Sequence, residues 1–101
     1  MFTLQPGPLP VVQAMKTAAT RAALLGLAVG DALGVPVEFV DREARRRDPV
    51  TGLRGYGTHH QPPGTWSDDS SLTFCLAETL ARPGGLTGLP DLADFGRRAI
   101  N

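Results

Sequence analysis

The stretch from Met15 to Leu33 limits the fold of this chain more than any other segment, because it is mainly small and apolar. Alanine and leucine favour a helix, and Pro36 cannot continue one. We therefore predict a first helix over this stretch and a flexible tail at residues 1–14. The apolar run from Ala22 to Val37 is shorter than the roughly 18–20 residues that a membrane span requires. We predict a buried helix and no membrane association.

Small residues recur every four positions along this predicted helix. They form one stripe, at Ala22, Gly26, Gly30 and Gly34, because positions four apart lie on the same face. Glycine inside a helix costs about 1 kcal/mol relative to alanine. The stripe therefore predicts that another backbone or a ligand approaches closely, and tight helix packing and ligand contact both stay open.

Downstream, the pattern predicts a long loop and two further helices. Residues 40–66 are rich in glycine and proline, apart from one helical turn expected in DREARRR. A second helix is expected over 67–81, and a third from near Pro90 or Asp91. No alternating strand pattern occurs, so the predicted fold class is all-α, with about three main helices. The last helical pattern has no stop signal before Asn101, which we interpret as a sign of a longer protein.

Charge and cysteine content narrow the class of partner. Ten basic and ten acidic residues cancel, so no net field favours nucleic acid or an anionic membrane. The basic charge of the segment from Arg42 to Arg47 is diluted by acidic neighbours, and we interpret this segment as a solvated face.

The single cysteine, Cys75, excludes an intrachain disulfide and fits a reducing compartment. We therefore expect a cytoplasmic protein.

The segment GTWSDDSSLTFCLAETL places two carboxylates side by side at a predicted helix start. In one interpretation Ser67 is the N-cap, and the helix dipole favours Asp68 and Asp69 by about 0.3–1 kcal/mol. In the other, the hydroxyl and both carboxylates are oxygen ligands for a hard cation such as Mg²⁺ or Mn²⁺. Neighbouring helical side chains diverge by about 100°, so the pair would serve two ions, or one ion and a water. Further oxygens would have to come from elsewhere.

Two acidic residues upstream are further candidates for such a site. Asp31 lies within the apolar helix, where an unpaired carboxylate is costly, and Glu38 lies just past its end. Asp31 could equally bond to a loop N–H or an arginine, and Glu38 could be a surface residue. We interpret His59 and His60 as solvated loop residues.

Two segments together resemble the ADP-ribosylglycohydrolase family, which includes the dinitrogenase-reductase-activating glycohydrolase. They are AALLGLAVGDALGVPVEF at 22–39 and GTWSDDSSLTFCLAETL at 64–80, separated by a Gly-rich loop. The resemblance covers roughly Thr17 to Asn101 and about a third of a full family member. It implies that residues 15–101 are the N-terminal part of an all-α ADP-ribosylglycohydrolase-like domain, truncated at its C-terminus.

The resemblance also implies a chemistry. Such proteins hydrolyse the N- or O-glycosidic bond between ADP-ribose and a protein side chain or small molecule, using a binuclear Mg²⁺ or Mn²⁺ centre. Their Thr/Ser-Asp-Asp motif maps onto Ser67, Asp68 and Asp69 as metal ligands. Their acidic residue after Gly-Asp-Ala-Leu-Gly maps onto Glu38, a catalytic candidate near the substrate. Asp31 receives a structural or ligand-supporting role.

One departure from the family is large. Its second metal motif, Asp-x-Asp-Thr/Ser, and its diphosphate-binding loops are absent from this sequence. We therefore expect the isolated chain to be inactive and to need a complementing C-terminal segment; a truncated reading frame and a split enzyme both agree with this. The alternative is a non-catalytic helical packing or interaction module derived from the same fold, whose apolar faces would favour self-association.

Overall fold

The computed structural model describes residues 8–85 and 91–100, and every regular element within them is a helix. In chain order the elements are α1 (Pro8–Gly34), the short 3-10 helix η1 (Val35–Val37), α2 (Arg42–Arg47), α3 (Asp68–Ala81) and α4 (Leu92–Ile100). No strand occurs in this part of the chain, so the predicted all-α fold class is confirmed.

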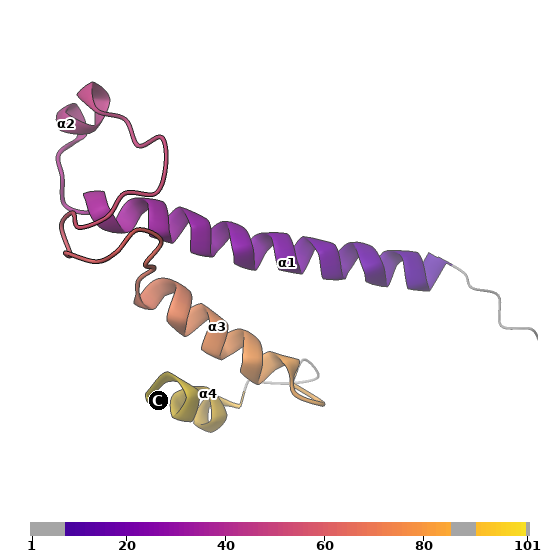
Figure 1. The fold of residues 1–101 in the computed structure, drawn as a ribbon. Helices are drawn as coiled ribbons and strands as arrows, with labels where there is room; N and C mark the ends of the chain where they lie inside the picture. Colours follow the sequence, from indigo (N-terminus) through magenta and orange to yellow (C-terminus); the bar gives the residue numbers. More distant parts are fainter. Residues whose placement is uncertain (1–7, 86–90, 101) are drawn as a thin grey trace, which may run out of the picture.

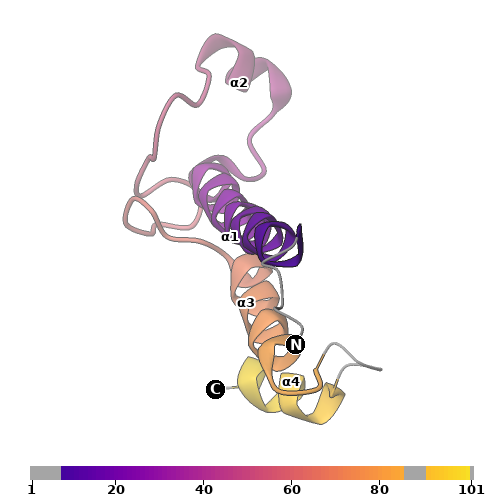
Figure 2. The same cartoon turned by 90° about the vertical axis from the view of Figure 1, so that its right-hand side faces the viewer.

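The C-terminal end of α1 is followed by η1 and lies beside the start of α3, whereas α4 packs on α3. The helix α1 is a long rod, and α3 starts beside its end and diverges from it (Figure 1). Contacts join α1 to η1 and to α3, and they join α3 to α4. The short helix α2 stands apart from the other helices, at the far side of a long loop (Figure 2). This topology brings the segment after α1 and the start of α3 to the same place.

Most of the predicted elements agree with those observed. The expected turn in DREARRR is α2, and α3 starts directly after Ser67 and ends at Ala81. The helix α4 begins at Leu92, where Asp91 Oδ1 accepts a hydrogen bond from the Asp94 N–H over 2.9 Å. Pro90, the other predicted start, lies outside the described residues.

The first helix differs from its prediction at its N-terminus. It begins at Pro8 rather than at Met15, so residues 8–14 of the predicted tail are helical. Proline is tolerated in a first turn because its missing N–H would have no intrahelical partner there. Residues 1–7 of that predicted tail lie outside the described residues.

Because α1 starts earlier than predicted, the length of its apolar segment has to be compared again with that of a membrane span. The segment Pro10–Val37 is long and apolar enough to cross a membrane by length and composition, whereas the sequence pattern predicted too short a run. This is weak evidence for a span, because the core helix of a globular protein passes the same test. The prediction of a buried helix is wrong for this chain, since Leu25 is 59% exposed and Val29 is 55% exposed.

The glycine stripe of α1 does not pack closely against another element among the described residues. A Cβ atom added at Gly26, Gly30 or Gly34 would meet no atom within 4 Å. The prediction of close packing along the stripe is therefore wrong for this part of the chain. Gly30 and Gly34 instead line a small cavity at the end of α1.

Polar contacts hold the helices together. Buried apolar side chains are few among the described residues and lie near the end of α1, at Ala32 and Val35. The fully buried side chains of α3 are instead Ser70 and Thr79. Thr79 Oγ1 donates a hydrogen bond to Asp94 Oδ2 over 2.8 Å, which joins α3 to α4. Ser70 makes the corresponding contact with α1.

Candidate functional site

The N-terminus of α3 is capped by Ser67. The backbone of this residue is extended (φ −96°, ψ −173°), and its Oγ accepts a hydrogen bond from the Asp69 N–H over 3.1 Å. The prediction that Ser67 is the N-cap of this helix is therefore confirmed. It does not exclude a cation site, because the cap uses the hydroxyl and leaves the carboxylates of Asp68 and Asp69 in the first turn.

Asp31 ties the end of α1 to the start of α3 through a single carboxylate oxygen. Its Oδ2 accepts hydrogen bonds from the backbone N–H groups of Ser67 and Ser70 over 2.9 and 3.2 Å. It also accepts from their hydroxyls over 3.0 and 2.6 Å. Partial burial alone would raise the pKa of Asp31, but these hydrogen bonds outweigh it and hold the pKa below its ordinary value. The ionised carboxylate thus satisfies donors that the helix terminus leaves open.

These contacts use most of the hydrogen-bonding capacity of the Ser67 side chain. A hydroxyl has one proton to donate and two lone pairs. The proton is donated to Asp31, and one lone pair accepts from Asp69. One lone pair is left, so the predicted ligand role of Ser67 requires a cation to share an oxygen that already has two partners.

The predicted site residues meet at one cavity of about 260 Å³, which we call the acidic cavity. Its lining residues come from the end of α1, from η1 and its exit, and from the start of α3: Gly30, Asp31, Gly34, Val35, Glu38, Ser67, Asp68 and Asp69. Four of these side chains are carboxylates and none is basic. The cavity therefore has a negative potential that favours a cation.

The carboxylates of Asp68 and Asp69 have no protein partner in the described part of the chain. Both residues are exposed, and neither side chain forms a hydrogen bond or ion pair there. Unpaired carboxylate oxygens are the ligand type that Mg²⁺ and Mn²⁺ prefer. The donors thus have the right chemistry for the predicted ions.

The number of converging donors is too small for a complete metal centre. Residues 8–85 and 91–100 contain no group of three or more His, Cys, Asp or Glu side chains that could hold a metal ion. An octahedral ion needs about six ligands. A cation in the acidic cavity would need water or oxygens from outside the described residues.

Glu38 lines the acidic cavity, just after η1. Its Oε2 lies 2.6 Å from His59 Nε2, so the carboxylate is held by an imidazole from the long loop. The prediction that His59 is an exposed loop residue is confirmed, and its contact with Glu38 is an addition that the sequence did not indicate. The ring also makes an edge contact with Phe39, at 6.1 Å between centroids.

The loop that carries His59 is docked on η1 by backbone contacts. The Thr58 N–H donates to Pro36 O over 3.0 Å, and its hydroxyl donates to Glu38 O over 2.7 Å. Gly57 permits this approach, because a Cβ there would lie 2.0 Å from Pro36 O. The docking joins residues about twenty positions apart, so helical periodicity could not have predicted it. The only local indication of a close backbone contact in the sequence is Gly57, which precedes Thr58.

A second cavity, of about 480 Å³, adjoins the first, and we call it the indole cavity. It is lined by Val35, Glu38, His59, Gln61, Thr65, Trp66, Ser67 and Asp68. Trp66 was not among the residues singled out from the sequence. Its indole Nε1 donates to Ser71 Oγ over 3.2 Å, and the ring packs edge-on against Phe74.

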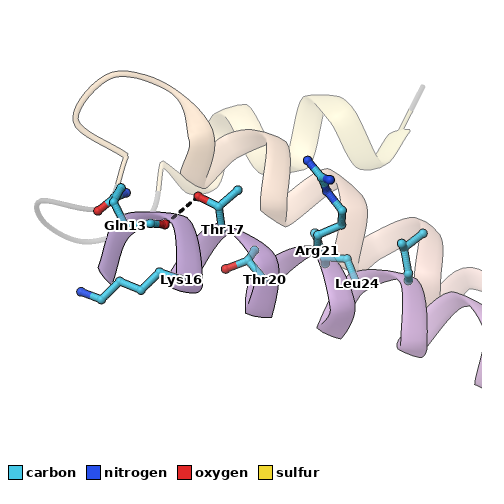
Figure 3. A pocket seen from close by; sticks show the side chains of 7 residues that line it. Gln13, Lys16, Thr17, Thr20, Arg21 and Leu24 are labelled. Carbon is cyan, nitrogen blue, oxygen red and sulfur yellow. Dashed lines mark hydrogen bonds between the residues drawn. The ribbon is translucent and has the colours of Figure 1, made fainter. Parts of the chain in front are cut away.

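A third cavity, of about 750 Å³, runs along the N-terminal half of α1 and contains no predicted site residue. Its side chains all come from this one helix (Figure 3): Gln13, Lys16, Thr17, Thr20, Arg21, Leu24 and Leu25. Its titratable side chains are basic, and it holds no carboxylate. It is therefore a surface of different chemistry from the two cavities at the α3 terminus.

Comparisons with known proteins agree with the resemblance seen in the sequence. The model of the ADP-ribosylglycohydrolase family matches residues 13–101. The chain is 42% identical over 64 residues to ADP-ribosylarginine hydrolase Tri1 of Pseudomonas putida (strain GB-1), which covers 63% of this chain and 16% of that protein. It is 39% identical over 75 residues to the ADP-ribosyl-[dinitrogen reductase] glycohydrolase of Rhodospirillum rubrum, covering 72% and 24%.

The chain therefore spans between about a sixth and a quarter of the length of these relatives. No solved structure matches it.

Proposed function

This chain belongs to the ADP-ribosylglycohydrolase family, and from this premise we propose that it supplies part of a site for metal-dependent hydrolysis of ADP-ribosyl N- or O-glycosidic bonds. The observation that carries the proposal is the acidic cavity, where Asp68 and Asp69 present unpaired carboxylates beside Glu38. The carboxylates of Asp68 and Asp69, which have no protein partner in the described residues, are available to a divalent cation.

The metal ligands in this proposal are Asp68, Asp69 and the free lone pair of Ser67. A bound pair of Mg²⁺ or Mn²⁺ ions would supply a polarised water and orient the ribose hydroxyls. Asp31 holds Ser67 and the first turn of α3 in position. The remaining ligands come from a complementing polypeptide, because the described residues do not gather enough donors.

Glu38 acts on the substrate side of the cavity. Glycosidic bonds break through a transition state that resembles an oxocarbenium ion. A carboxylate in the lining of the cavity favours that developing positive charge. His59 fixes one of its oxygens and leaves the other free to face the substrate.

The substrate class follows the names of the relatives. One is named for ADP-ribosylarginine and another for ADP-ribosylated dinitrogen reductase. We propose an ADP-ribosylated protein as the partner of this chain, or a small molecule that contains ADP-ribose. We place the reaction in the cytoplasm, because the single cysteine, Cys75, is free and suits a reducing compartment.

Manganese binding to the intact chain tests the metal part of the proposal. Titration followed by electron paramagnetic resonance of free Mn²⁺ should show binding that Asp68→Ala and Asp69→Ala each weaken at least tenfold. Glu43→Gln is the matched control, since it removes one carboxylate from α2 outside the cavity. Equal affinity in all three variants contradicts the assignment.

A chimera tests the catalytic part. The segment of the Rhodospirillum rubrum relative that aligns with this chain is replaced by the 75 matching residues, and release of ADP-ribose is measured by chromatography. The chimera should be active, and its Glu38→Gln and Asp68→Ala variants should lose most of that activity. A folded but inactive chimera argues against the function.

The alternative proposal is a non-catalytic packing or interaction module. The observation in its favour is the exposed apolar face of α1, where Met15 is 67% exposed and Leu25 is 59% exposed. Light scattering on the intact chain would then show a concentration-dependent oligomer that Leu25→Lys disrupts. A monomer that binds Mn²⁺ favours the enzymatic proposal instead.

A further inference from the structure

Glu38 lies at the corner of a tight turn that follows η1. The Val40 N–H donates a hydrogen bond to Val37 O over 3.1 Å, which closes a four-residue turn. Glu38 has φ −57° and ψ 142°, and Phe39 has φ 66°. These angles are close to those of a type II β-turn, whose third residue has a positive φ and is usually glycine or asparagine. In this chain the third residue is a phenylalanine.

The phenylalanine gains little from this conformation. A residue other than glycine is strained when its backbone is left-handed, and Phe39 is 84% exposed, so the turn does not bury its ring. A type I turn would relieve the strain, because its third residue has a negative φ. The two turn types differ by a flip of the central peptide, which here joins Glu38 to Phe39. Contacts from outside the turn are therefore needed to keep this peptide in the type II orientation.

Thr58 supplies such a contact. Its hydroxyl donates a hydrogen bond to Glu38 O, the carbonyl oxygen of the central peptide, over 2.7 Å. The same hydroxyl lies farther from Pro36 O, at 3.3 Å. A flip to type I would turn Glu38 O away from Thr58 and break the shorter contact. The hydroxyl of Thr58 therefore favours the strained turn over the relaxed one.

His59, the next residue in the loop, holds the side chain of Glu38. A carboxylate only accepts hydrogen bonds, so His59 Nε2 carries the proton and donates to Glu38 Oε2 over 2.6 Å. The two side chains are 42% and 48% exposed, and an ion pair as exposed as this adds little to stability. The main effect of the contact is therefore on the orientation of the carboxylate.

We propose that Thr58 and His59 are positioning residues for Glu38. Thr58 holds the Glu38–Phe39 peptide in the type II orientation, which keeps His59 beside the carboxylate, and His59 holds that carboxylate in one orientation. The strain at Phe39 is tolerated because these contacts fix the place of a functional group. The inference rests on the proposed function, because Glu38 is the group proposed to act on the substrate.

Nuclear magnetic resonance of the intact chain tests the turn. The nuclear Overhauser effect between Glu38 Hα and Phe39 HN is strong in a type II turn and weak in a type I turn, because the peptide flip separates these protons. It should fall at least threefold in Thr58→Val, which lacks the hydroxyl, and stay unchanged in Thr58→Ser. Thr51→Val is the matched control, since it removes a hydroxyl from an exposed position in the same loop. An undiminished effect in Thr58→Val overturns the inference.

A second substitution distinguishes a flipped turn from a general loss of structure. Glycine adopts a positive φ without strain, so it favours the type II turn without help from Thr58. Adding Phe39→Gly to Thr58→Val should therefore restore the strong effect between residues 38 and 39. If glycine does not restore it, the hydroxyl of Thr58 does not act through this turn, and the inference is overturned.

The γ-protons of Glu38 test the second contact in the same chain. They have separate chemical shifts while the side chain is held in one rotamer, and the shifts converge when it rotates freely. They should converge in His59→Leu and stay separate in His59→Gln, whose amide N–H can donate in place of Nε2. The control is His60→Leu, at the neighbouring position. Separate shifts in His59→Leu overturn the assignment of His59.

The kinetics of the chimera described above test the positioning role. Thr58→Val and His59→Leu should each lower kcat at least tenfold and change KM less than twofold, whereas Thr58→Ser and His59→Gln should retain most of the activity. An unchanged kcat in both loss variants of an active chimera overturns the inference. An unmodified chimera that is inactive contradicts the proposed function instead, and the magnetic resonance measurements on the intact chain then decide the inference by themselves.

Discussion

Oδ2 of Asp31 accepts a hydrogen bond from the buried hydroxyl of Ser70 over 2.6 Å, and this contact joins the end of α1 to the first turn of α3. The same oxygen accepts three further hydrogen bonds, from the N–H of Ser70 and from the N–H and hydroxyl of Ser67. The position of α3 beside α1 therefore depends on one ionised group.

Replacing that group is expected to destabilise the chain. Asp31→Asn keeps the shape but loses the charge, and hydrogen bonds to charged groups contribute roughly 1.5–3 kcal/mol. The free energy of unfolding should fall by about 2 kcal/mol, measured by urea denaturation with circular dichroism. Asp68→Asn is the matched control, because that carboxylate has no partner in the described residues, and it should cost less than about 1 kcal/mol. Equal losses would show that Asp31 does not hold the two helices together.

Acid should weaken the contact between α3 and α4. Hydrogen bonds from Arg98 and Thr79 lower the pKa of Asp94 from 3.8 to about 2. A pKa that is lower in the folded state means that the contact is fully stabilising above about pH 4 and is lost as the pH falls towards 2. Urea midpoints measured between pH 6 and pH 2 should decline in this window, and both Asp94→Asn and Arg98→Gln should flatten the decline. An unchanged slope in Asp94→Asn would contradict this assignment.

The parts of the structure that sequence reasoning predicted are those with local causes. The start of α3 follows from the N-cap propensity of Ser67 and from Asp68 and Asp69 in the first turn, all within three residues. The partner of Asp31 could not be predicted, because Ser67 and Ser70 are more than thirty positions away. Periodicity reports which residues share a helix face, and it does not report which elements meet.

The same limit explains the wrong prediction of burial for α1 and the contact in the loop that was not predicted. The apolar pattern of α1 predicted burial, but burial depends on what covers a face, and Leu25 and Val29 stay exposed here. The contact of His59 with Glu38 depends on the docking of the whole loop on η1. The glycine and proline content predicted an irregular loop, but it could not predict which residues the loop contacts.

Loop docking itself can be tested at a glycine. Gly57→Ala would place a Cβ 2.0 Å from Pro36 O, and overpacking of this kind costs roughly 1–3 kcal/mol. The loop should detach from η1, and trypsin should cleave after Arg54 several-fold faster than in the unmodified chain, measured by mass spectrometry. Gly52→Ala is the control, because a Cβ there meets no atom within 4 Å. If both variants are cleaved at the same rate, the contact with Pro36 does not hold the loop.

The two interpretations of Ser67 can be separated by comparing its substitutions. Ser67→Ala removes the cap, which costs about 1 kcal/mol, and it also removes the oxygen proposed as a metal ligand. Ser67→Thr keeps the hydroxyl and should retain most of the stability and of the Mn²⁺ affinity. Thermal unfolding measures the first property, and electron paramagnetic resonance of free Mn²⁺ measures the second. If Ser67→Ala lowers stability but binds Mn²⁺ as tightly as Ser67→Thr, then the hydroxyl only caps α3, and the cation must be held by Asp68 and Asp69.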